Sequence, residues 1–368
     1  MHIGTLIHEQ GTTVNDLVQR AHNAAETGLR GVWLGQNTGW DALTVAAVIG
    51  RAVSTVDVGT AVVPTYPRHP LMLAGQALTV QSAMASRLTL GIGVSHPHII
   101  EGQFGYSFER PAQHLREYLQ VLMPLLRGES VQFAGERLRA AGRIDVVSPP
   151  PPSVLIGALG PAMLRLAGEL ADGTVTTWIG PSALDHHIVP RLTRAAAAAG
   201  RAAPRVVVCL FVGVTHNADD LRTALAHRYG AAGEIASYRA ALDHEGAGGP
   251  EHTAILGDEN AVEKPDSTSF RRGCDRTGGD ARRHRARAGA YGRAAGRAHE
   301  VKPGARPLIA TDASTAVIDR RAEGARGRRV RAQCAGRQAR DNDCRRGRGP
   351  CRVRIRCAEE SPAGRPRP

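Results

Sequence analysis

The sequence has no long apolar run and little cysteine over most of its length. No segment approaches 18 uninterrupted apolar residues, so no membrane-spanning helix is expected. Cys209 is the one cysteine before residue 264, so disulfides are not expected there, and we expect a cytoplasmic protein. The first ten residues lack a basic stretch followed by a long apolar run, so no signal peptide is expected.

The sequence also lacks the fingerprints of several common ligands. Neither a GxGxxG motif after a strand nor a P-loop occurs, so binding of NAD(P) or ATP is not expected from fingerprints. Up to residue 263, histidines, cysteines and carboxylates do not cluster at zinc-binding spacings. We therefore expect no metal site.

Charge divides the chain into two parts. Residues 1–263 hold 19 Lys and Arg against 23 Asp and Glu, a net charge of −4. Residues 264–368 hold 28 against 11, a net charge of +17, together with both lysines and five of the six cysteines. This break predicts a folded domain over 1–263, followed by a basic tail rich in Arg, Gly, Ala and Pro over 264–368.

Within the first part, short apolar runs alternate with longer amphipathic ones. Strands are expected at 2–9, 29–35, 57–64, 87–95, 154–160, 173–180 and 205–216. Helices are expected at 12–28, 40–53, 70–85, 110–128, 161–172, 181–200 and from 217 onward. Nearly continuous apolar strands separated by helices are typical of a parallel sheet covered on both faces. Seven evenly spaced units favour a (β/α)₈ barrel over an open doubly wound sheet. Only the start of a helical region, at 257–263, leads toward an eighth unit.

Three segments carry a family resemblance. They are VGTAVVPTYPRHP (58–70), RLTLGIGVSH (87–96) and IGALGPAMLRLAGELADGTVTTW (156–178). Together they resemble the bacterial luciferase-like monooxygenase superfamily, and more narrowly its actinobacterial oxidoreductases that use the deazaflavin coenzyme F420. The resemblance covers 1–263 and implies an α/β fold, a TIM-type barrel with the cofactor at its C-terminal mouth. It further implies hydride transfer between the cofactor ring and a small organic substrate. FMN is the alternative cofactor, in a luciferase-like monooxygenase, and the family is often homodimeric.

The resemblance also implies where the cofactor lies. A non-proline cis peptide at Ala61–Val62 would back the ring, and the residues after Gly93 would hold the ribityl chain. The cofactor phosphate would lie at GALGP (157–161), where a Gly-Pro helix start offers free amides to an anion. The residues expected to contact the cofactor are Gly35, Gln36, Ala61, Val62, Gly93, Val94, Ser95, Gly157, Ala158, Leu159, Gly160 and Pro161.

His96, Trp40 and His8 are the catalytic candidates. The two histidines fall near the ends of strands, where an imidazole could transfer a proton near neutral pH. Trp40 could stack on a substrate or pack under a loop. Sugar-phosphate-oxidising relatives carry an Asp-His pair where this chain has Gly35-Gln36, which puts a sugar-phosphate substrate in doubt.

The basic tail has three interpretations. Its charge suits a nucleic-acid-binding arm, but Phe270 and Tyr291 are its only aromatic residues, which argues against base stacking. Its cysteines form no CxxC pair, which argues against a zinc module. The third interpretation is translation out of frame from near Glu263. Read one base along, residues 270–300 can encode a strand, an amphipathic helix and then a stop.

We favour the shifted frame, and therefore expect no specific nucleic-acid partner and no membrane partner. On this hypothesis the tail is largely disordered. The barrel then lacks its native eighth β/α unit and stays open between its seventh and first strands, so the activity of the chain as translated is in question. Only 305–312 in the tail is apolar enough to mimic a strand.

Overall fold

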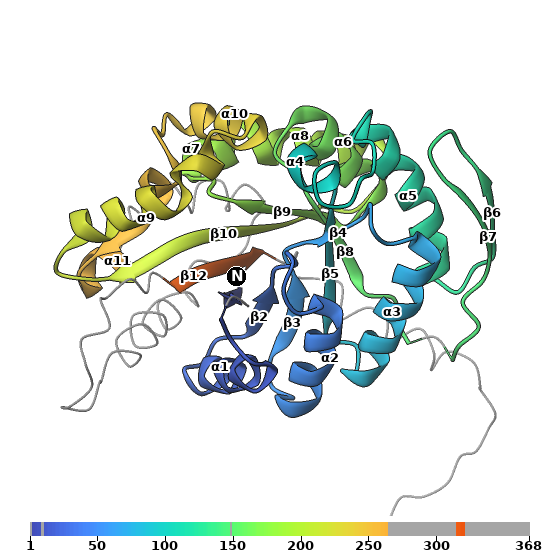
Figure 1. Cartoon of the computed structure of the whole chain (residues 1–368), viewed down its shortest axis with the longest axis horizontal. Helices are drawn as coiled ribbons and strands as arrows, with labels where there is room; N and C mark the ends of the chain where they lie inside the picture. Colours follow the sequence, from blue (N-terminus) through green and yellow to red (C-terminus); the bar gives the residue numbers. More distant parts are fainter. Residues whose placement is uncertain (1, 9–10, 148, 264–313, 321–368) are drawn as a thin grey trace, which may run out of the picture. The chain divides into compact units, whose positions relative to one another are not determined.

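A closed barrel, in which all strands but one are parallel, is surrounded by helices in the described part of the chain (Figure 1). The computed structural model describes residues 2–8, 11–147, 149–263 and 314–320. Seven strands follow one another as parallel neighbours. They are β1 (His2–Ile7), β2 (Gly31–Leu34), β3 (Asp57–Thr60) with its continuation β4 (Val63–Pro64), β5 (Leu88–Gly93), β8 (Ser153–Gly157), β9 (Gly173–Thr177) and β10 (Arg205–Val214). All seven predicted strands are confirmed.

Helices cover the outside of the barrel and confirm the predicted pattern. They are α1 (Val14–Glu26), α2 (Ala42–Ala52), α3 (Pro70–Ala83), α5 (Pro111–Leu126), α6 (Pro161–Leu170), α8 (Val189–Ala198) and α9 (Ala218–Gly233). The stretch before α8 is the short α7 (Pro181–Ala183) followed by one π-helical turn, η1 (Leu184–Ile188). Helix α1 begins with a capping box, in which the side chains of Thr13 and Asp16 each accept the other's backbone amide.

Several elements were not expected from the sequence. They are the hairpin of β6 (Val131–Ala134) and β7 (Arg139–Gly142), the short α4 (Pro97–Ile100), α10 (Ala236–Glu245), the 3₁₀ turn η2 (Pro250–Thr253) and β11 (Ile255–Gly257). The hairpin lies between the helix expected at 110–128 and the strand expected at 154–160. The expected helical start at 257–263 is confirmed by α11 (Glu259–Glu263).

The gap between the seventh and first strands is closed, so the expectation of an open barrel is wrong. Strand β12 (Ser314–Arg320) lies between β10 and β1 and is antiparallel to both (Figure 1). Val317 aligns with Cys209 on one side and with Gly4 on the other. Without β12, β1 and β10 would be edge strands with unpaired amides and carbonyls. A strand running in either direction can form hydrogen bonds with such an edge. The eighth place is therefore filled by a reversed strand from the tail rather than by a parallel β/α unit.

This strand is a folded part of the tail, most of which was expected to be disordered. Its middle residues are buried, and Val317 joins the core inside the barrel with Trp33, Leu155 and Cys209. The predicted strand-like stretch 305–312 and the rest of the tail lie outside the described residues. The proposals of disorder, of a shifted frame and of nucleic-acid binding there concern that undescribed part.

Candidate active site

A pocket of about 700 Å³ opens at the carboxyl-terminal ends of β2, β4 and β5. Active sites of (β/α)₈ barrels lie at this end, and the volume suits a small organic ligand. Its apolar side chains are Pro64, Pro67, Met72, Ile99 and Phe104. Its polar side chains are Gln36, Asn37, Thr38, Asp41, Arg68, His69, Gln76, Ser95 and Gln103.

Two of the predicted cofactor residues, Gln36 and Ser95, line this pocket. Gln36 lies two residues beyond β2, and its side-chain oxygen accepts the backbone N–H of Ala42 at 2.7 Å. Ser95 lies two residues beyond β5 in the left-handed backbone region, with φ of 62°. Gly35 precedes Gln36 and is partly buried. The ends of two strands far apart in sequence thus meet at one opening.

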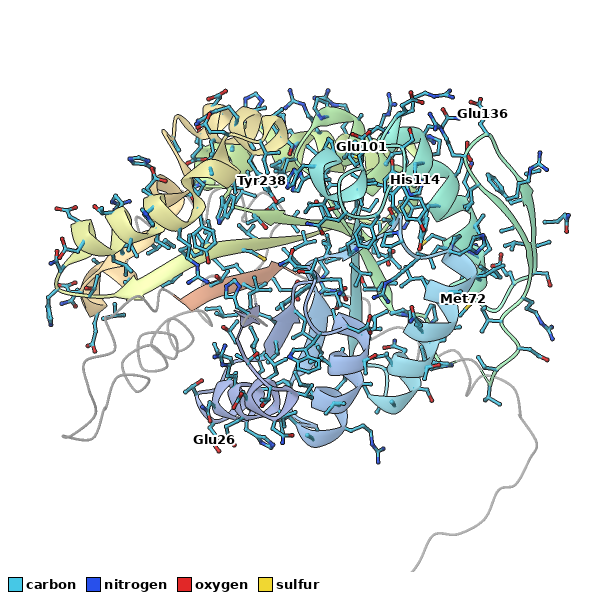
Figure 2. All side chains as sticks on the ribbon, in the orientation of Figure 1. Glu26, Met72, Glu101, His114, Glu136 and Tyr238 are labelled. Atoms are coloured by element: carbon cyan, nitrogen blue, oxygen red, sulfur yellow. The ribbon has the colours of Figure 1, made fainter. Side chains whose placement is uncertain are left out.

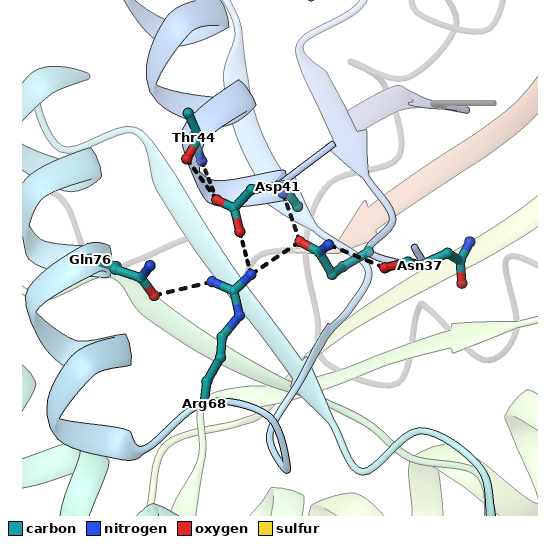
Figure 3. Close-up of polar contacts among 7 residues, drawn as sticks. Asn37, Asp41, Thr44, Arg68 and Gln76 are labelled. Carbon is teal, nitrogen blue, oxygen red and sulfur yellow. Dashed lines mark hydrogen bonds and ion pairs between the residues drawn. The ribbon is translucent and has the colours of Figure 1, made fainter. Parts of the chain in front are cut away.

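Arg68 and Asp41 form an ion pair in the wall of the pocket (Figure 3). This pair was not predicted from the sequence. Asp41 caps α2, accepting the amide and hydroxyl of Thr44 at 2.8 Å each. Burial raises the pKa of the Asp41 carboxyl, but the hydrogen bonds from Arg68 and Thr44 outweigh it and hold the pKa below its usual value. The only sequence signal was the position of Arg68 shortly after the third strand.

The peptide bond between Ala61 and Val62 is cis, at the position that the resemblance implied. Val62 packs where two glycines leave room. A Cβ on Gly93 would stand 2.8 Å from a Val62 methyl carbon, and one on Gly157 would stand 3.4 Å away. The structure therefore brings three of the predicted cofactor segments together, with the Val62 side chain in the space that Gly93 leaves.

The predicted phosphate segment, 157–161, runs from the end of β8 to the first residue of α6 and does not line the pocket. Gly160 is the N-cap of α6, no side chain caps the helix, and a Cβ on Gly160 would have no atom within 4 Å. The similar Gly-Pro start of α7 is filled, because the Glu245 carboxylate accepts the amide of Ala183 at 2.7 Å. Open space beside the uncapped amides of α6 leaves room for an anion.

The backbone just before this helix is held in place from outside. The ring of His187, in the π-helical turn η1, lies with Nε2 2.8 Å from the carbonyl oxygen of Leu159.

Two other predicted cofactor residues pack with the main core: Val94 is half-buried and Ala158 is buried. Pro161 is exposed at the first turn of α6, where proline is favoured.

His96 lies beside aromatic rings rather than in the pocket wall. Its ring centroid is 5.8 Å from that of His98 and 5.3 Å from that of Tyr238. The ring centroids of Tyr238 and Trp178 are 4.9 Å apart. Figure 2 shows Tyr238 on α10, near the strands β9 and β10. Burial, and then the neighbouring His98, lower the pKa of His96. His96 therefore links the end of β5 to the aromatic cluster after β9.

The other two catalytic candidates lie elsewhere, so the structure does not bring the three together. His8 places Nε2 3.1 Å from the hydroxyl of Thr315 on β12, and burial is the main cause that lowers its pKa. Trp40 is 46% exposed, and its indole N–H donates to the carbonyl of Thr12 at 2.8 Å. This bond favours the alternative in which Trp40 packs against a loop.

Neither membrane nor metal features were found in the described ranges. No helix there is both long and apolar enough to cross a bilayer. Within the same ranges, no three His, Cys, Asp or Glu side chains gather as a metal site would require.

Comparison with known proteins gives one family. The family model described as luciferase-like monooxygenase matches residues 1–273. A Mycobacterium tuberculosis protein named for an inferred coenzyme F420-dependent oxidoreductase activity is 29% identical over 172 residues, 43% of this chain and 50% of that protein. The F420-dependent glucose-6-phosphate dehydrogenase of Nakamurella multipartita is 31% identical over 191 residues, 50% of this chain and 56% of that enzyme. The chain spans about half the length of these two relatives.

Solved structures share the fold. An F420-dependent secondary alcohol dehydrogenase aligns with a TM-score of 0.63 at 16% identity, covering 74% of this chain and 91% of that chain. The oxygenating constituent of 3,6-diketocamphane monooxygenase from Pseudomonas putida, solved with FMN, aligns with a TM-score of 0.58 at 16% identity, covering 73% of this chain and 88% of that chain. At these identities the likeness establishes the barrel and not its chemistry.

Proposed function

The chain belongs to the luciferase-like monooxygenase family, and from that premise we propose that it is a coenzyme F420-dependent oxidoreductase acting on a small organic substrate. The observation that carries this proposal is that the cis bond at Ala61–Val62 lies beside Gly93 and Gly157, next to the uncapped start of α6. The pocket of about 700 Å³ at the mouth of the barrel would hold the substrate. Relatives named for F420 use support the choice of cofactor. Bound F420 supplies a hydride acceptor or donor at C5 of its deazaflavin ring.

The residues present fit such a cofactor. The phosphate would bind the amides at the start of α6, where Gly160 faces open space and no side chain caps the helix. Ala61, Val62 and the residues after Gly93 would hold the ring and its side chain. His96 is half-buried beside this segment and is neutral at pH 7 because burial lowers its pKa, so it would accept a proton rather than donate one.

An FMN-dependent monooxygenase is the second candidate. The amides of α6 would take the phosphate of FMN equally well, and a fold neighbour was solved with FMN. Direct binding separates the two. The full-length protein is titrated with F420 and with FMN, and cofactor fluorescence is followed. We expect F420 to bind at least tenfold more tightly. Tighter binding of FMN supports the monooxygenase instead, and binding of neither cofactor refutes both.

A variant in the outer helix α1 serves as the control for this titration. Glu26 is exposed and far from the mouth of the barrel (Figure 2). Glu26→Ala should bind both cofactors as the unchanged protein does. Any loss in this variant would show that the fluorescence change reports protein quality rather than the site.

A further inference from the structure

The charged side chains that line the mouth pocket neutralise each other. They are Arg68 and Asp41, whose side chains are 17% and 33% exposed. The guanidinium of Arg68 binds the Asp41 carboxylate through Nη2 and donates through Nη1 to Gln76 at 3.1 Å (Figure 3). The same Nη2 also donates to Gln36 at 3.4 Å. Both terminal nitrogens of the arginine are thus engaged by groups of the protein.

His69 adds no charge to the pocket. Its Nδ1 accepts the backbone N–H of Leu71 at 3.3 Å, so that nitrogen carries no proton. Its Nε2 then carries the proton and donates to the carbonyl of Arg139 at 3.0 Å. A ring with one donating and one accepting nitrogen is neutral. Among the described lining residues, a bound anion would meet no cation that lacks a carboxylate partner.

Large apolar side chains stand exposed in the same wall. Met72 on α3 is 66% exposed (Figure 2). Phe104, just beyond α4, is 41% exposed. Ile99, which lies between Met72 and Phe104 in the sequence, also lines the pocket. Exposed apolar groups that gather at one opening are typical of a surface that binds an apolar ligand. The amides of Gln36, Gln76 and Gln103 add hydrogen-bonding groups without adding charge.

We propose that this pocket takes an uncharged organic molecule with a largely apolar surface, and that the Asp41–Arg68 pair excludes phosphorylated and carboxylated ligands. Calling this ligand the substrate rests on the proposed function. An anion that bound Arg68 in place of Asp41 would leave the half-buried Asp41 carboxylate without its partner and beside a second negative charge. Binding of such an anion is therefore unfavourable. An uncharged ligand leaves the pair intact.

Asp41→Asn tests the proposal because it frees Arg68 while keeping the helix cap. Asparagine caps helices as well as aspartate does, so α2 should stay folded. The probes are 2-naphthol and 2-naphthyl phosphate, which share one apolar body and differ in charge. Their binding to the full-length protein is measured by fluorescence polarisation, without reference to turnover. We expect the unchanged protein to prefer 2-naphthol at least tenfold, and Asp41→Asn to bind 2-naphthyl phosphate at least tenfold more tightly than the unchanged protein does.

The double variant Asp41→Asn/Arg68→Gln is the matched control. It should lose the gained affinity for the phosphate, which shows that the gain depends on Arg68 and not on the amides of α6. Equal binding of the two probes by the unchanged protein, no binding of 2-naphthol, or no gain in a folded Asp41→Asn variant overturns the proposal. Binding of F420 is measured separately on each protein. Failure of the cofactor proposal is therefore distinguishable from failure of this one.

Discussion

Arg205 and Asp319 form a two-point ion pair that joins the start of β10 to the end of β12. Nε of Arg205 lies 2.7 Å from one carboxylate oxygen of Asp319, and Nη2 lies 2.5 Å from the other. Nη1 donates to the hydroxyl of Thr89 at 3.0 Å. The two side chains are only 10% and 7% exposed. A parallel strand in this place would carry Asp319 to the opposite end of the barrel, so the pair favours the reversed direction of β12.

Asp319→Asn should strongly destabilise the protein. The substitution leaves a buried guanidinium without its carboxylate, and breaking a buried pair from one side costs about 3–5 kcal/mol. The free energy of unfolding is measured by urea denaturation followed by circular dichroism. We expect the urea concentration at the unfolding midpoint to fall. Loss of β12 pairing should appear as faster hydrogen exchange of the Val317 amide.

The double variant Arg205→Met/Asp319→Leu is the comparison that isolates the unpaired charge. Removing both charges together should recover most of the stability lost in Asp319→Asn. An Asp319→Asn protein as stable as the original would show that β12 does not close the barrel in solution.

The parallel strands could be predicted because they are buried on both faces. Every residue from Leu88 to Gly93 is buried, so β5 is a continuous apolar run whatever its neighbours. The signal for the start of α1 is also local in the sequence, because Thr13 and Asp16 lie three residues apart and form a capping box with each other. Signals of this kind need no knowledge of the rest of the fold.

Features that depend on distant partners could not be predicted in this way. The hydroxyl of Thr5 donates to the carbonyl of Thr315, 310 residues away, and nothing near 314–320 marks it as a closing strand. Arg68 and Asp41 are 27 residues apart and meet only because β2 pairs with β3, the strand that β4 continues. Gln36 could be predicted as a mouth residue because it lies just after a strand, and Ser95 because the family resemblance implied it. The local sequence thus indicates which residues reach the mouth, and the fold decides how they pair.

Gly160→Asp should weaken cofactor binding without harming the fold. Gly160 is the N-cap of α6, has an extended backbone, and has no atom within 4 Å of an added Cβ. Aspartate is a favoured N-cap, so the helix should gain a few tenths of a kcal/mol. Its carboxylate would occupy the amides as Glu245 does at α7, and would repel the cofactor phosphate. We expect the Kd for F420 to rise about tenfold or more, about 1.4 kcal/mol, in a fluorescence titration.

Gly160→Asn is the matched control, because asparagine caps the helix with the same shape and no charge. It should weaken F420 binding much less than Gly160→Asp does. Equal losses in the two variants would point to steric blocking, and no loss in either would place the phosphate elsewhere.

Glu117→Ala should loosen the hairpin of β6 and β7. One oxygen of the buried Glu117 carboxylate accepts the amides of Arg137 and Leu138 at 2.8 and 2.9 Å, and the other accepts that of Glu136 at 3.2 Å. Removing an acceptor shared by several amides should cost about 2 kcal/mol. We expect at least tenfold faster hydrogen exchange at Arg137 and Leu138.

Glu136→Ala is the comparison for this hairpin. Glu136 lies at the tip of the hairpin and pairs with Arg110 only at the exposed surface (Figure 2). Exposed ion pairs contribute little to stability, so exchange at Leu138 should change little. Similar exchange rates in the two variants would rule out the Glu117 carboxylate as the anchor of the turn.

His114 should make the protein less stable in mild acid. The ring stacks on Tyr66 with centroids 3.9 Å apart, Nε2 lies 3.0 Å from the hydroxyl of Thr65, and burial lowers the pKa to about 4. In the unfolded chain a histidine takes its proton near pH 6.5, so between about pH 6.5 and 4 the unfolded state binds more protons. Stability is therefore fully present above pH 6.5 and is lost as the pH falls toward 4. His114→Gln keeps a polar partner for Thr65 but cannot titrate, so its unfolding free energy should fall by about 2 kcal/mol less between pH 7 and 4.5, measured by urea denaturation at both values. His227→Gln, at an exposed histidine of α9, is the matched control for the loss of an imidazole. An identical acid loss in the original protein and His114→Gln would show that other groups cause it.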